Sequence, residues 1–200
     1  MGVLFLTEEF ISAKDRIISA SIEIVSEAGL FSLTPGHVSM RTNIREDMLY
    51  RYYSNTDEIL SDIVDYYFRF DNAVFNTVRS LDSNYVDKLH MYIEDFATYY
   101  GNYQSLSAIM MQYEELLHNT TVRDKIESGY LTRYSFLHNL FDNAIKNKEI
   151  KDDFSPVELA DFVTAIFRIK VLNRRVMNTS KPLKDEIIQT MDKWFKYIIV

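Results

Sequence analysis

Carboxylate and imidazole side chains recur at a helical spacing in two places of the sequence. Asp87 stands three residues before His90, and Glu115 stands three residues before His118. On a helix this spacing puts both groups on one face, as in metal-carrying helical bundles, so a metal-dependent bundle enzyme is one hypothesis. That scaffold also needs two further inward glutamates. No Ser-His-Asp arrangement, Gly-rich phosphate loop or nucleotide fingerprint is present, so we predict a protein that is not an enzyme, with no metal or cofactor.

Charge and cysteine content restrict the class of protein further. The 200 residues are 47% hydrophobic, which is enough to bury a real core. A net charge of −7 argues against general polyanion binding, so any nucleic-acid contact must come from a local arrangement. The absence of cysteine fits a reducing cytoplasm. The first ten residues are neither a signal peptide nor long enough to span a membrane, and we predict a soluble cytoplasmic protein without membrane contact.

The elements that position these residues are expected to be helices throughout. Apolar residues recur at three- and four-residue steps, and only three prolines and five glycines interrupt them. Short helices come first, at 12–28, from the Thr34-Pro35 pair to Thr42, and at 45–53; a helix of about six turns then starts at Asp57. Later helices are expected near 84–103, 105–118, 121–148, 156–177 and 183–198. The prediction is an all-α chain with a helix-turn-helix domain at 10–56, a larger helical domain at 57–200, and a connecting helix at 57–81.

Three short helices with a four-residue turn describe a helix-turn-helix. In this chain the segments RIISASIEIVSEAGLFSLT, VSMRTNI and LYRYYSNTDEIL follow one another without a gap. As an ordered set, residues 16–60 resemble the amino-terminal domain of the TetR family of transcriptional regulators. Gly29 matches the glycine that closes the first helix of that family, and Thr34 matches the threonine that opens its second. Val38, Thr42 and Ile44 fall at its small or apolar core positions.

The resemblance implies which residues would contact DNA. Leu49 and Tyr53 would belong to the core, Tyr50 and Thr34 would hydrogen-bond phosphates, and Arg41 and Arg45 would contact the backbone. Arg51 would pair with a base edge, since a guanidinium binds guanine bidentately. The full expected set is Thr34, Gly36, Arg41, Arg45, Glu46, Asp47, Met48, Tyr50, Arg51, Tyr52 and Thr56.

This stretch departs from the family pattern in its charge. Thr56 occupies the position of the lysine that clamps a phosphate, and Glu46 and Asp47 precede the recognition residues. Between Lys14 and Leu60 five basic residues face seven acidic ones, a net charge of −2, where a DNA reader is normally basic. The alternative is therefore a ligand- or protein-binding module that keeps the fold with weak or lost DNA binding.

The later helices carry a heavy aromatic load, part of 14 tyrosines and 13 phenylalanines in the chain. By the resemblance they would line a cavity for a hydrophobic or aromatic effector, with tyrosine hydroxyls orienting it. For any one residue, ordinary core packing is the competing interpretation. The candidates are Phe96, Tyr99, Tyr100, Tyr103, Met110, Met111, Tyr113, Tyr134, Phe136, Phe141, Phe162 and Phe167.

Apolar stripes on the last two helices predict association, because Trp194 and Phe195 lie so near the chain end that a monomer should bury them poorly. The resemblance implies a homodimer through a four-helix interface. Its expected residues are Phe162, Ile166, Ile169, Ile188, Met191, Trp194 and Phe195.

The resemblance further implies a repressor whose two reading domains enter successive major grooves of a palindromic operator. An effector would swing the helix at 57–81 and change their spacing.

Overall fold

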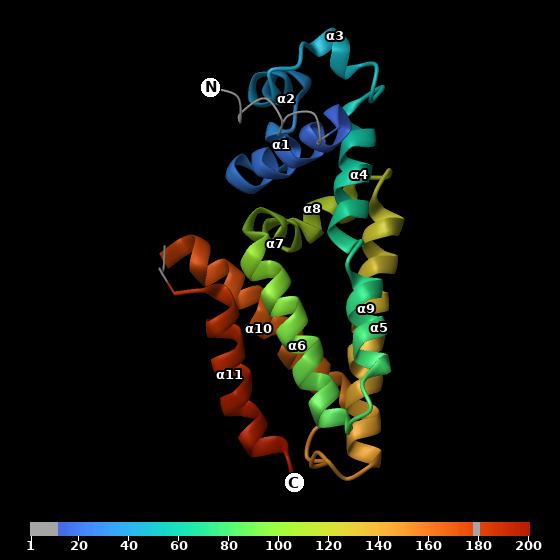
Figure 1. Cartoon of the computed structure of the whole chain (residues 1–200), viewed down its shortest axis with the longest axis vertical. Coiled ribbons are helices and arrows are strands. Elements are labelled where there is room, and N and C mark those ends of the chain that lie inside the picture. The colour runs from blue at the N-terminus through green and yellow to red at the C-terminus, as the bar shows by residue number, and fades with distance from the viewer. Residues whose placement is uncertain (1–11, 178–180) are drawn as a thin grey trace, which may run out of the picture.

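The chain folds into helices stacked along one long axis (Figure 1). The computed structural model describes residues 12–177 and 181–200. The first ten residues, which are expected not to be a signal peptide, lie outside the described residues, and so do residues 10 and 11 of the expected helix-turn-helix domain. Within that part the only strand-like pairing is a single antiparallel bridge between Ile150 and Ile199. The elements are α1 (Ala13–Ala28), a 3-10 turn (Leu30–Ser32), α2 (Pro35–Thr42), α3 (Glu46–Leu49), α4 (Thr56–Phe68), α5 (Asp71–Ser80), α6 (Tyr85–Asn102), α7 (Gln104–Met110), α8 (Tyr113–His118), α9 (Arg123–Lys146), α10 (Pro156–Met177) and α11 (Leu183–Ile198). The all-α prediction is confirmed.

Local capping signals explain where the first helices begin and end. Ser12 caps α1, its hydroxyl accepting from the Asp15 N–H at 3.1 Å. Gly29 ends α1 at φ 82°, a backbone conformation that glycine adopts without a steric cost. Thr34 caps α2 by accepting from the His37 N–H at 3.2 Å, and Pro35 occupies the first helical position.

The turn between α2 and α3 is fixed by buried polar contacts. Thr42 is 6% exposed; its hydroxyl donates to the Val38 carbonyl at 2.7 Å and accepts from the Ile44 N–H at 3.2 Å. Arg16 of α1 donates to the Thr42 carbonyl at 2.7 Å, which satisfies a free group at the end of α2. Asn43 then takes the left-handed conformation at φ 56°. The turn is therefore attached directly to α1.

Two of the predicted long helices are each broken into two, and α3 is shorter than predicted. The expected helix at 57–81 is interrupted at residues 69–70, between α4 and α5, and the expected helix at 105–118 is interrupted between α7 and α8. The second break has a packing reason: α7 packs on α1 whereas α8 packs on α9, which one straight helix could not do. The third helix ends at Leu49 rather than Tyr53, and hydrogen-bonded turns continue the chain to Tyr53.

The buried side chains form one continuous core that joins both ends of the molecule. In Figure 1, α1–α3 lie at one end, α4, α5 and α9 run along one side, and α6, α10 and α11 complete the other. Helix α1 packs on α4 and α7, so the helix-turn-helix is in contact with the larger helical part. Among the described residues, no helix has the length and apolar character needed to cross a bilayer.

Candidate functional site

The exposed end of the helix-turn-helix presents the residues expected to read DNA. Tyr50, Arg51 and Tyr52 are exposed, while Leu49 and Tyr53 beside them are 2% and 4% exposed. The buried pair anchors the turn on α1 and α4, so the three residues between them are directed outward. Thr34, Gly36, Met48 and Thr56 are half-buried, and Arg41, Arg45, Glu46 and Asp47 are exposed.

Most basic side chains on this end are already paired within the chain. Arg41 bonds Glu27 at 2.5 Å and Glu23 at 3.1 Å, both on α1, and its hydrogen bonds lower the pKa of the Glu27 carboxyl. Arg45 pairs with Asp47 at 2.8 Å. Arg51, by contrast, has no ion-pair partner within residues 12–177 and 181–200. Arg51 is therefore the guanidinium here that can bind an external acceptor without first losing a carboxylate.

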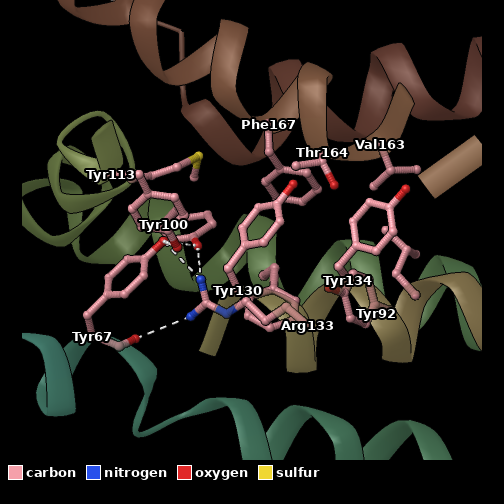
Figure 2. Close-up of a pocket in the computed structure, with 13 residues that line it drawn as sticks. Tyr67, Tyr92, Tyr100, Tyr113, Tyr130, Arg133, Tyr134, Val163, Thr164 and Phe167 are labelled. Atoms are coloured by element: carbon pink, nitrogen blue, oxygen red, sulfur yellow. Dashed lines mark hydrogen bonds between the residues drawn. The ribbon is translucent and has the colours of Figure 1, made fainter. Parts of the chain in front are cut away.

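A cavity of about 70 Å³ lies in the larger helical part (Figure 2). Its walls come from α4, α6, α7, α8, α9 and α10. The lining residues are Tyr67, Tyr92, Phe96, Tyr100, Met110, Tyr113, Tyr130, Arg133, Tyr134, Leu137, Val163, Thr164 and Phe167. Six of the expected residues thus meet there: Phe96, Tyr100, Met110, Tyr113, Tyr134 and Phe167. Tyr99, Tyr103, Met111, Phe136, Phe141 and Phe162 do not line it; for Phe141, which is fully buried, core packing is the correct interpretation.

A buried ion pair forms one wall of the cavity. Arg133 donates from Nε and Nη2 to the two carboxylate oxygens of Asp71, each at 2.6 Å, and Asp71 is 6% exposed. The guanidinium lies 4.5 Å from the Tyr67 ring centroid and 4.6 Å from that of Phe68. Burial raises the pKa of Asp71, and the Arg133 guanidinium opposes that rise.

The same arginine explains the break between α4 and α5. In a continuous helix the Tyr67 carbonyl would accept from the N–H of residue 71. Here it accepts from Arg133 Nη2 at 3.3 Å and from the Tyr99 hydroxyl at 3.4 Å. The break therefore leaves a carbonyl for Arg133 and turns Asp71 inward to meet it.

Sequence reasoning missed Arg133, although one signal for it was available. The buried face of α9 consists of Ile126, Arg133, Leu137, Leu140, Phe141 and Ala144. Arg133 is in phase with this apolar stripe at three- and four-residue steps, and a charged residue so placed needs a buried partner. Tyr67 was missed because it lies in the expected connecting helix at 57–81, before the helices in which the cavity was expected. Tyr92 lies in one of those helices, at 84–103, where ordinary core packing explains a tyrosine equally well.

The expected interface residues separate into two groups. Phe162 and Ile169 are 39% and 42% exposed, while Ile166, Ile188 and Trp194 are half-buried. Met191 and Phe195 are each 1% exposed, so the expectation that a monomer buries Phe195 poorly is wrong. Phe195 packs on His90 of α6 with ring centroids 4.4 Å apart, because α11 folds back along α6.

An exposed apolar stripe runs along α10 beyond the expected residues. Phe162, Ala165, Ile169, Leu172 and Val176 are all exposed and alternate by three and four positions; we call them the α10 seam. This is the spacing with which helices pack against one another in bundles.

The two Asp/Glu-x-x-His pairs do not build a metal site: no three His, Asp or Glu side chains gather for one within the described residues.

Three solved structures have a similar fold, and two of them are described as transcriptional regulators. The ketosteroid transcriptional regulator KstR2 of Mycobacterium tuberculosis superposes with a TM-score of 0.85 at 12% identity, covering 94% of this chain and 96% of that one. AibR in complex with isovaleryl coenzyme A and operator DNA gives 0.72 at 17%, covering 90% and 96%. A chain described as a TetR-family transcriptional regulator from Rhodococcus sp. gives 0.71 at 15%, covering 90% and 96%. No protein-family model and no curated protein matches the sequence. The chain has the TetR-family fold, as its helix-turn-helix residues predict.

Proposed function

We propose that this chain is a ligand-responsive transcriptional regulator, a repressor, that binds palindromic operator DNA as a homodimer. The observation that carries the proposal is the position of α4. This helix begins at Thr56, directly after the exposed residues of the helix-turn-helix, and its last turn carries Tyr67 into the wall of the cavity. Thirteen residues of helix span about 20 Å, so one rigid element connects the two sites.

The mechanism follows from a difference in affinity. A ligand that fits the cavity better in one position of α4 shifts the protein toward that position. The shift moves the helix-turn-helix and changes the distance between the two reading domains of a dimer, which must match the spacing of successive major grooves. The effector therefore has to prefer the conformation that does not bind DNA.

The α10 seam supports the dimer. An apolar stripe of this length on the surface of one chain is typical of an interaction site. A second copy of the same chain offers an identical stripe, and a twofold axis would bring the two together. Trp194, stacked on Phe162 with centroids 4.3 Å apart, would extend the contact to α11.

A second candidate function is a ligand- or protein-binding module that has lost DNA affinity. The pairing of Arg41 with Glu23 and Glu27, and of Arg45 with Asp47, favours it, since these cations are occupied. Two experiments separate the candidates.

The first is binding of the protein to the DNA upstream of its own gene across a salt series. We expect Arg51→Ala to weaken binding by about fivefold to 150-fold, the effect of losing one bidentate base contact of about 1–3 kcal/mol. Lys88→Ala is the matched control, because it removes an equal charge from α6, outside the helix-turn-helix. No binding at low salt, or equal loss in both variants, would contradict DNA reading by Arg51.

The second experiment tests whether acidic side chains of the helix-turn-helix domain weaken its binding to DNA phosphates. Glu27→Gln should strengthen DNA binding by a few-fold at most, because it removes one negative charge and the shorter of the two ion pairs of Arg41, leaving only the pair with Glu23. Thr56→Lys should strengthen it too and steepen the salt dependence. Asp153→Asn changes the net charge equally in the loop before α10 and should have no effect. If Asp153→Asn matches Glu27→Gln in a binding titration, Arg41 is not a DNA contact.

A further inference from the structure

Three tyrosine hydroxyls meet at one end of the cavity, beside Arg133 (Figure 2). The Tyr67 and Tyr100 oxygens are 2.8 Å apart, and the Tyr113 hydroxyl donates to Tyr67 at 3.1 Å. Arg133 Nη1 donates to both Tyr67, at 2.9 Å, and Tyr100, at 2.7 Å. Burial raises the pKa of Tyr100 and Tyr113 well above the ordinary tyrosine value, so these hydroxyls keep their hydrogens.

The hydrogens of this cluster can be assigned by counting. A hydroxyl oxygen accepts at two lone pairs and donates one hydrogen. Tyr67 already accepts from Arg133 and Tyr113, so its own hydrogen must go to Tyr100. Tyr100 then accepts from Arg133 and Tyr67, and no acceptor within residues 12–177 and 181–200 takes its hydrogen. One hydroxyl hydrogen is therefore left over, on a side chain that lines the cavity.

The charge of Arg133, in contrast, is fully used inside the protein. A guanidinium has five N–H donors. Those of Arg133 go to both carboxylate oxygens of Asp71, to the hydroxyls of Tyr67 and Tyr100, and to the Tyr67 carbonyl. Arg133 is the only cation among the lining residues, and Asp71 neutralises it. An ionised ligand would therefore add an uncompensated charge to a buried site, at a high desolvation cost.

We propose that the cavity binds a small apolar, ring-containing molecule with one neutral oxygen acceptor, such as a ketone, aldehyde or ether, and that the Tyr100 hydroxyl donates to that oxygen. Phe96, Leu137, Val163 and Phe167 supply apolar walls for the remainder of the molecule. The volume of about 70 Å³ favours a small ligand, and the flexible Met110 side chain in the wall has to move aside for a ring to enter. This inference rests on the proposed function, because it names the class of effector for the same cavity.

Three probes of equal heavy-atom count test the proposal by calorimetric titration of the full chain without DNA. Acetophenone carries the neutral carbonyl, cumene replaces it with a methyl-bearing carbon, and benzoate replaces it with a charged carboxylate. We expect acetophenone to bind about threefold to tenfold more tightly than cumene, the effect of one net hydrogen bond. Benzoate should bind at least about tenfold more weakly than acetophenone.

Two single hydroxyl deletions locate the donor. In Tyr113→Phe the count still leaves one hydrogen over, so the preference for acetophenone should remain. Tyr100→Phe removes the proposed donor itself and leaves the hydrogen on Tyr67, whose oxygen is 2.8 Å away from that position, so the preference over cumene should shrink. An unchanged preference in Tyr100→Phe would show that Tyr100 is not the donor. Equal binding of acetophenone and cumene by the unaltered chain, tighter binding of benzoate, or no acetophenone binding at millimolar concentration would each overturn the proposal, whether or not Tyr100→Phe folds.

Failure of this proposal and failure of the proposed function remain distinguishable. The titrations contain no DNA, so a protein that never binds its upstream DNA can still show the acetophenone preference. Conversely, DNA binding that depends on Arg51 can be present while all three probes bind alike.

Discussion

Replacing Asp71 with alanine should lower the free energy of unfolding by about 3–5 kcal/mol, because it leaves the guanidinium of Arg133 buried without a counter-charge. The side chain of Arg133 is 11% exposed and that of Asp71 is 8% exposed, so water cannot take over the lost partner. Two bonds of 2.6 Å to one carboxylate are lost together. Urea or guanidinium denaturation, followed by circular dichroism, measures the change.

An exposed pair that joins α9 to the neighbouring α4 provides the comparison. Lys125 of α9 reaches Asp65 of α4 at 2.6 Å, but that Asp65 side chain is 59% exposed. Asp65→Ala should therefore cost less than about 1 kcal/mol. The double variant Asp71→Leu/Arg133→Met should recover much of the stability, because it removes both charges and fills the space with apolar atoms. Equal losses from Asp65→Ala and Asp71→Ala would show that the buried pair has no special weight.

The parts of the fold that sequence predicts are those that depend on neighbouring residues. Ser12, Gly29 and Thr34-Pro35 act on the helix ends beside them, and these boundaries agree with prediction. The order of Leu49 and Tyr53 around three polar or aromatic residues fixes which side chains are buried, and the structure confirms it. Such signals need no knowledge of distant contacts.

The parts that sequence misses depend on contacts between distant residues. The apolar spacing of 57–81 continues through Arg69 and Phe70 without a proline or glycine, so nothing local marks the break. At the break, Arg133, 66 residues after Tyr67, donates to the Tyr67 carbonyl. Arg133 also bonds two of the tyrosine hydroxyls in the cavity wall, so an aromatic lining could be predicted from the sequence while the hydrogen-bond arrangement of that wall could not.

The burial of Phe195 also depends on a contact between distant residues. An aromatic residue near the chain end suggested association, but α11 packs along α6 and buries it within the chain. The exposed apolar residues are instead those of the α10 seam, which include the predicted interface residues Phe162 and Ile169. Alternation by three and four positions is visible in the sequence, but only the fold shows which of two apolar faces of α10 is already covered.

Ile169→Glu should dissociate the proposed dimer. Ile169 is the middle residue of the α10 seam and is 42% exposed in the single chain. Twofold symmetry places every interface residue in the contact twice, so one substitution introduces two carboxylates. Burying each without a partner costs roughly 2–3 kcal/mol, and the dimer dissociation constant should rise at least about a thousandfold.

Leu131→Glu is the matched control for this effect. Leu131 lies on α9, away from the α10 seam, and is more exposed than Ile169, at 59%. It undergoes the same chemical change, so a general loss of solubility or stability would affect both variants alike. Sedimentation velocity over a concentration series should show dimers for the unaltered chain and for Leu131→Glu, and monomers for Ile169→Glu. Monomers in all three would contradict the dimer, and with it the reading of two half-sites, because a lone chain has only one helix-turn-helix to place on the DNA.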